Sequence, residues 1–301
     1  MRRALAMLAC AALLSGACAP APSGPREPLR LDQLTGDEAA NSAGARATAI
    51  AFVRGYAAAD PSGLTAMTSL AGSAPIRGWV HWQGVQLAQF PGTIDGVVDL
   101  RDAGVATPVA DIPGTSTLLR DVAVQADVTF DYDPDRGVPF STTRTIGSIR
   151  VARDEGHPWV VVDLIRDDLP ISAVFQPVGA VVKGNAITVT LDSFVADPRS
   201  NAWQFDLIVR SSLSGPLRLA GADAALVDAG GNEISVATSV SETLASIGAG
   251  TDIEGLVRFD ALDHVGGVTL SLRFSGPGVA GTAEFPLQGQ IEAVTGAARA
   301  A

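Results

Sequence analysis

The N-terminal part of the chain shows the spacing of an α-helix. Between residues 44 and 56, apolar side chains recur three or four positions apart, which places five on one helical face: Ala45, Ala49, Phe52, Val53 and Tyr56. Asp60 and Pro61 end this helix and begin another, because aspartate favours the N-cap and proline the first helical position. The second helix is predicted to bury Leu64, Met67 and Leu70.

Apolar and polar residues then alternate between positions 121 and 132, which predicts a half-buried strand. The turn chemistry of residues 133–137 follows, and two further strands are expected over 142–153 and 159–165. This order of two helices and a long antiparallel meander resembles the nuclear-transport-factor-two-like cone fold. The resemblance implies a curved sheet that wraps around a helix and often encloses a pocket.

Cleaner alternation returns in the C-terminal part, over residues 187–191, 203–209 and 268–274. Shorter strands are expected near residues 222–227, 233–236 and 253–259. Several short strands without a helical period predict a β-sandwich. The element order, with Trp203 and Phe205 two positions apart, resembles the telokin-like, immunoglobulin-like domains of bacterial lipoproteins. That resemblance implies a binding or spacer module.

The predicted fold class is therefore an α+β N-terminal domain, with helices and a curved antiparallel sheet, and an all-β immunoglobulin-like sandwich. A length of 301 residues favours two domains. The expected divisions are a signal peptide (1–17), a tether rich in proline (18–43), a cone-like domain (44–170), a linker (171–183), a sandwich (184–293) and a disordered tail (294–301).

The first 18 residues have the pattern of a secretory signal. Arg2 and Arg3 precede an apolar run of 11 residues, residues 4–14, which is too short to span a bilayer. The end of this run, Leu14-Ser15-Gly16-Ala17-Cys18, resembles a bacterial lipobox. The resemblance implies lipidation of Cys18 after cleavage before it. The alternative is an ordinary signal peptide with an incidental cysteine, which would leave a secreted protein.

Charge narrows the choice of partners. The net charge is −11, and removal of residues 1–17 takes away two arginines and no acids, which leaves −13. A surface this acidic gives nucleic acid little to bind, so no nucleic-acid partner is expected. Attachment to a membrane would therefore depend on the N-terminal lipid, for which two acyl chains are sufficient.

One acidic turn resembles a calcium loop. Asp131, Asp133 and Asp135 alternate as calcium ligands do, but Arg136 displaces the expected glycine and Thr142 replaces the final glutamate. A solvated hairpin turn is the favoured interpretation, and any calcium binding would be weak.

A second candidate site is a pocket lined by Trp79, His81 and Trp82. His81 could act as an acid or base with Asp95, Asp99 or Asp102, and the favoured alternative is that the aromatic residues pack a core edge. The histidines, His81, His157 and His264, show no local zinc-ligand spacing, so neither a metal site nor a cofactor is expected.

These features predict a membrane-anchored extracytoplasmic lipoprotein that acts as a non-catalytic binding or accessory module of the cell envelope. Its expected partners are the membrane, other envelope proteins or a small apolar ligand. The rival hypotheses are a cone-fold enzyme with a His/Asp pair in its pocket, and a structural spacer for an envelope complex.

Overall fold

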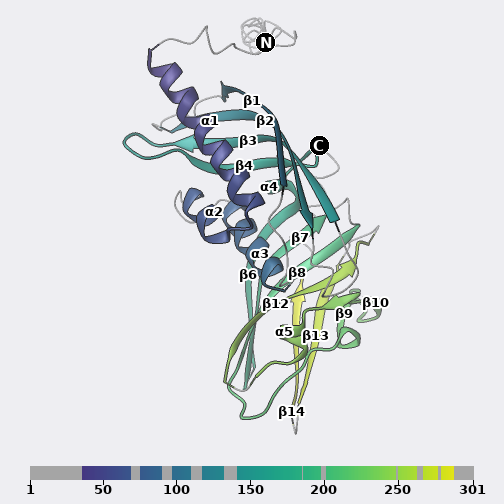
Figure 1. The fold of residues 1–301 in the computed structure, drawn as a ribbon. Coiled ribbons are helices and arrows are strands. Elements are labelled where there is room, and N and C mark those ends of the chain that lie inside the picture. The colour runs from purple at the N-terminus through teal and green to yellow at the C-terminus, as the bar shows by residue number, and fades with distance from the viewer. Residues whose placement is uncertain are drawn as a thin grey trace, which may run out of the picture.

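The computed structural model describes most of the chain after residue 35. The described ranges are 36–68, 75–89, 97–109, 117–131, 141–184, 186–197, 201–248, 250–262, 267–276 and 279–287. Antiparallel sheets dominate this part of the molecule, and a few helices accompany them (Figure 1). Within the described ranges, no helix combines the length and the hydropathy that crossing a bilayer requires.

Helix α1 (Gly36–Ala57) lies across one face of the first sheet (Figure 1). The predicted face is confirmed, because Ala45, Ala49, Phe52, Val53 and Tyr56 are all buried. The helix begins at residue 36, inside the expected tether. Its first turns dock on the sheet because the Glu38 carboxylate accepts hydrogen bonds from the buried Arg120 guanidinium at 2.9 and 3.1 Å.

Two shorter helices complete this layer. Helix α2 (Pro61–Met67) begins as predicted, with an Asp60 carboxylate oxygen accepting from the Gly63 amide at 3.0 Å. Helix α3 (Pro75–Gln89) buries Ile76, Trp79, Val80 and Trp82.

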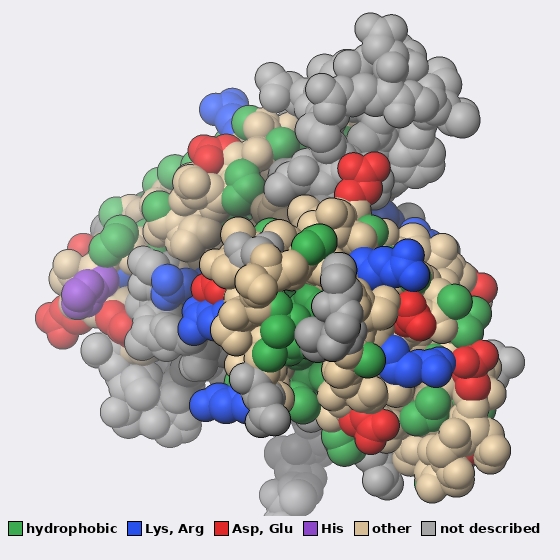
Figure 2. Space-filling view, turned by 90° about the horizontal axis from the view of Figure 1, so that it is seen from below, with side chains coloured by type: hydrophobic (Ala, Val, Ile, Leu, Met, Phe, Trp, Pro, Cys, Tyr) green, Lys and Arg blue, Asp and Glu red, His purple; other side chains and the backbone are tan. Residues whose placement is uncertain are grey.

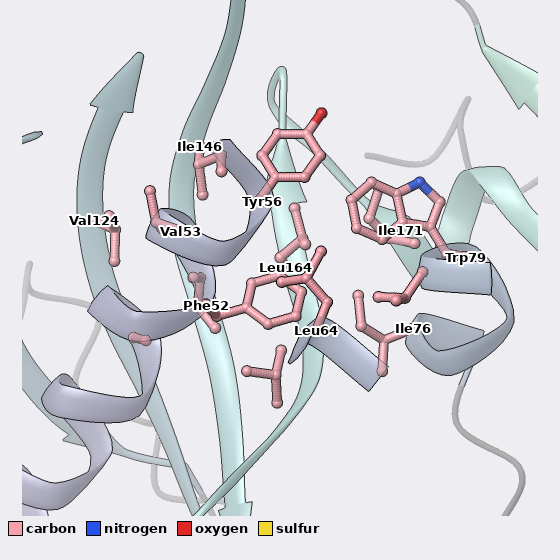
Figure 3. Packing of buried hydrophobic residues seen from close by; sticks show 14 of the residues in the cluster. Phe52, Val53, Tyr56, Leu64, Ile76, Trp79, Val124, Ile146, Leu164 and Ile171 are labelled. Carbon is pink, nitrogen blue, oxygen red and sulfur yellow. The ribbon is translucent and has the colours of Figure 1, made fainter. Parts of the chain in front are cut away.

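The first sheet is an antiparallel meander with the strand order β1-β2-β3-β4-β5. Its strands are β1 (Val97–Pro108), β2 (Leu118–Asp131), β3 (Ser141–Arg153), β4 (Val160–Arg166) and β5 (Leu169–Pro170). In the first core, side chains of α1, α2 and α3 meet Val124, Ile146 and Leu164 of the sheet (Figure 3).

The segment expected as a linker forms regular structure. It contains the short helix α4 (Ile171–Val174) and strand β6 (Phe175–Lys183), which pairs with β7 (Ile187–Asp197). Strand β6 alternates buried or half-buried with more exposed residues, which is the pattern of an edge strand packed on one face.

Two sheets make up the C-terminal half. One has the order β11-β12-β8-β7-β6 and the other β10-β9-β13-β14. Their strands are β7 (Ile187–Asp197), β8 (Ala202–Ser211), β9 (Ala224–Val227), β10 (Glu233–Val236), β11 (Ser239–Val240), β12 (Asp252–Asp260), β13 (Thr269–Gly276) and β14 (Val279–Pro286). The short helical segment η3 (Gly221–Asp223) lies between β8 and β9, and α5 (Glu242–Ala245) lies between β11 and β12.

The second core lies between these two sheets. Trp203, Phe205 and Phe259 from one sheet pack with Leu270 and Phe274 from the other. Phe205 contacts Phe194 and Phe259 with ring centroids 5.0 and 5.6 Å apart. This face-to-face packing of antiparallel sheets is compatible with a β-sandwich.

Candidate functional site

Helix α3 joins the two halves of the molecule. It contributes Trp79 to the first core, and that core also contains Val195 of β7 and Leu256 of β12. The helix approaches β6 closely, since a methyl group added at Gly78 would lie 2.8 Å from the Phe175 ring. The α3 helix therefore lies against the outer face of the sheet that contains β6, β7, β8 and β12 (Figure 1).

Strand alternation places an acidic residue on that outer face. Phe205 and Leu207 of β8 point into the second core, so Asp206 between them points the other way, toward α3. Its register partners are Ser193 on β7 and Leu256 on β12. Asp206 is thereby held in the centre of the sheet and is fully buried.

A β-bulge and a neighbouring strand bring two more carboxylates to the same place. On β7 the register passes from Leu191 to Ser193, so Asp192 is an extra residue in the ladder. Such bulges change the direction of a side chain. Glu254 of β12 lies two residues from Leu256 and hence on the same sheet face.

His81 of α3 completes a group that we call the junction cluster: His81, Asp192, Asp206 and Glu254. One potential ligand atom from each of His81, Asp192 and Asp206 lies within 4.8 Å of the other two. His81 Nε2 lies 2.6 Å from Glu254 Oε1. A nearby hydrogen bond of 2.8 Å, donated by Gln86 Nε2 to Gln204 Oε1, also connects α3 to the sheet.

The burial of Asp206 is electrostatically costly. Neither of its carboxylate oxygens accepts a hydrogen bond within the part of the chain that the structure describes. Desolvation, followed by the negative charges of Glu254 and Asp192, raises the pKa of Asp206 to about 8. Desolvation also raises the pKa of Asp192. Buried carboxylates without a donor keep a proton or require a cation.

The cluster already contains one source of positive charge. The hydrogen bond with Glu254 raises the pKa of His81 to about 9, against the opposing effect of desolvation. The His81 side chain remains 53% exposed, so water partly screens its charge, and its direct partner is Glu254. The positive charge of His81 therefore neutralises Asp192 and Asp206 only in part.

The structure places the sequence candidates differently. Trp79 and Trp82 lie in the first core, whereas His81 meets carboxylates of the C-terminal half. Among the described side chains, the carboxylate that bonds to His81 is Glu254. Asp99 and Asp102 lie on β1, opposite Asp127 and Gln125 of β2, and Asp95 is outside the described residues.

Other candidates cannot be placed. Cys18, Asp133, Asp135 and His264 lie outside the described residues, and Asp131 is the last residue of β2. His157 is exposed, as expected.

The face of the molecule seen in Figure 2 carries basic and acidic side chains side by side, without a large area of one sign.

A hollow of about 460 Å³ opens at the C-terminal half, away from the junction cluster. Its lining is formed mostly by small and apolar residues: Pro216, Leu217, Arg218, Ala245, Ser246, Ser275 and Gly276. Arg218 is the only charged residue in this lining, and its Nε donates a hydrogen bond to Ser275 Oγ at 3.3 Å. The junction cluster is the better candidate site, because it brings a histidine and buried carboxylates together.

Comparisons of the chain with protein-family models, curated proteins and solved structures found no match. The junction cluster therefore has to be interpreted from its own geometry.

Proposed function

We propose that this protein is a lipid-anchored, extracytoplasmic binding protein of the cell envelope, and that it binds a cationic ligand at the junction cluster without catalysing a reaction. The finer fold that accompanies the proposal is a cone-like α+β domain followed by an immunoglobulin-like sandwich. The anchor rests on the lipobox-like sequence that ends at Cys18.

The observation that carries the binding function is the state of Asp206. Its carboxylate is fully buried, has no hydrogen-bond donor among the described residues, and lies beside Asp192. With its pKa raised to about 8, this group keeps a proton near neutral pH, and a bound cation is the partner that would let it ionise while it stays buried. The expected ligand thus changes from the small apolar molecule predicted from the sequence to a cation.

Cation binding can be measured directly on the full chain in detergent, after a chelator has removed metals. Calorimetric titrations with Mg²⁺, Ca²⁺, Mn²⁺, Zn²⁺ and spermidine should show that at least one cation binds at one site per chain. Asp206→Asn should weaken that binding about tenfold or more, which corresponds to about 1.4 kcal/mol. Asp252→Asn, at an exposed residue paired with Arg210, is the matched control and should leave it unchanged. Absence of binding by every cation would refute the proposal.

The anchor is tested separately by metabolic labelling with an acyl-chain probe in a bacterial host. The wild-type chain should carry the label and sediment with membranes, because two acyl chains at about 0.8 kcal/mol per buried methylene give stable attachment. Cys18→Ala should lose both properties. Equal labelling of the two proteins would exclude lipidation at this residue.

A further inference from the structure

We propose that the ligand of the junction cluster is a divalent metal ion of the zinc class, bound directly by His81, Asp192 and Asp206. This inference rests on the proposed cation-binding function and names the ligand. The three residues come from α3, β7 and β8, so the ion would join the helix to the outer face of the sheet.

The spacing of the donor atoms suits such an ion. The ligand atoms of His81, Asp192 and Asp206 lie within 4.8 Å of one another. Zinc binds imidazole nitrogen and carboxylate oxygen at about 2.0–2.2 Å, which sets two ligands of one ion about 3–4 Å apart. Small rotations of side chains therefore bring the three donors onto one ion, without movement of the backbone.

The kind of donor selects the class of metal. Calcium takes six to eight oxygen ligands, and magnesium keeps much of its water, so neither gains from an imidazole. Zinc and its first-row neighbours accept imidazole and carboxylate together. Three protein ligands also leave a coordination position for water or for a group of a partner.

Two of the carboxylate features agree with metal binding. The oxygens of Asp206 have no partner among the described residues, so a metal would not have to displace an existing hydrogen bond there. His81 Nε2 donates to Glu254 Oε1 at 2.6 Å, so the ion would bind Nδ1 after that nitrogen releases its proton to solvent. A carboxylate that hydrogen-bonds to a histidine fixes the orientation of the ring, and such contacts change metal affinity by about 10–100-fold. Glu254 is thus a positioning residue in this site.

The decisive experiment compares Zn²⁺ with Ca²⁺ and Mg²⁺ on the metal-free full chain in detergent, by calorimetry and by thermal unfolding. Zn²⁺ should bind one to one, at least about tenfold more tightly than the other two ions, and should raise the unfolding temperature because it binds the folded state. His81→Gln, Asp192→Asn and Asp206→Asn should each lower the affinity for Zn²⁺ about tenfold or more.

Matched controls separate the site from surface binding. His157→Gln changes an exposed histidine elsewhere, and Asp252→Asn changes an exposed carboxylate on the same strand as Glu254, so both should retain wild-type affinity. Glu254→Gln keeps all three ligands but removes the carboxylate that orients the His81 ring, and should lower the affinity for Zn²⁺ about tenfold. Circular dichroism of every variant confirms that it is folded, and three independent ligand variants keep the test valid if one of them is not.

The possible contrary outcomes have different meanings. Binding of Ca²⁺, Mg²⁺ or spermidine in preference to Zn²⁺, with sensitivity to Asp206→Asn, overturns the zinc assignment and leaves the proposed function standing. Zinc binding that none of the three ligand variants weakens overturns this site. Failure of all cations to bind overturns both proposals.

Discussion

Replacing Trp203 by alanine is expected to lower the free energy of unfolding by about 3–5 kcal/mol, which is the range for removal of a large aromatic side chain from a core. Trp203 is only 2% exposed and lies in the second core. Its ring meets Phe194 edge-on with centroids 5.8 Å apart, so the substitution removes both buried area and an aromatic contact. Urea denaturation followed by far-ultraviolet circular dichroism measures the change.

The control for this experiment is Val181→Ala on strand β6. Val181 is 49% exposed, and surface substitutions generally change stability by about 0.5 kcal/mol or less. A loss below about 1 kcal/mol for Trp203→Ala would mean that the two C-terminal sheets do not share the core that the structure shows.

A second large effect is expected from pH in the metal-free protein. The pKa of Asp206 is about 8 in the folded state and near 3.8 ordinarily, so the folded state binds more protons between these values. The stability of the folded state should therefore fall as pH rises from about 4 to 8, by on the order of 5 kcal/mol. The raised pKa of His81, about 9, acts in the same direction between about 6.5 and 9.

Asp206→Asn isolates the contribution of the buried carboxylate. The groups that face residue 206 are His81 from α3, Asp192 from β7 and Glu254 from β12, and they remain in this variant. The variant should lose most of the decline between pH 5 and pH 8 and should be more stable than the wild type at pH 8.5. Measurements with a chelator present test this. An equal dependence of stability on pH in the two proteins would show that the Asp206 carboxyl is not desolvated in the folded state.

The Asp252→Asn variant should keep the wild-type decline in stability between pH 5 and pH 8. Hydrogen bonds from Arg210 lower the pKa of Asp252, so this exposed group is charged throughout the range from pH 5 to pH 9. Its removal changes only a surface ion pair, which solvent and salt screen. If this control also lost the pH dependence of its stability, the effect would come from the many acidic groups on the surface and not from Asp206.

Sequence periodicity was sufficient for the elements that bury one face. The apolar stripe of α1, the alternating residues of β2 and the Asp60 cap of α2 lie as the pattern predicts. Periodicity was not sufficient where a helix consists mainly of small residues. The segment after Gly36 is rich in small residues, which is typical of a tether, but the ion pair of Glu38 with Arg120 holds it against the sheet.

The site was much harder to predict, because its parts are far apart in the sequence. His81 and Glu254 are 173 positions apart, and no local spacing connects them. The one available signal was Asp206, a carboxylate in the apolar run of β8 between Phe205 and Leu207. The place of Asp192 depends on a β-bulge against β8, and such a register shift follows from how two strands pair.

The shared packing at α3 also bears on how such a protein can evolve. Val195 and Leu256 belong to strands of the C-terminal half but complete the core of the N-terminal half. A recombination event that exchanged either half for an unrelated module would leave apolar side chains facing water and would separate Gln86 from Gln204. Exchange of either half would therefore require compensating substitutions where α3 meets the sheet.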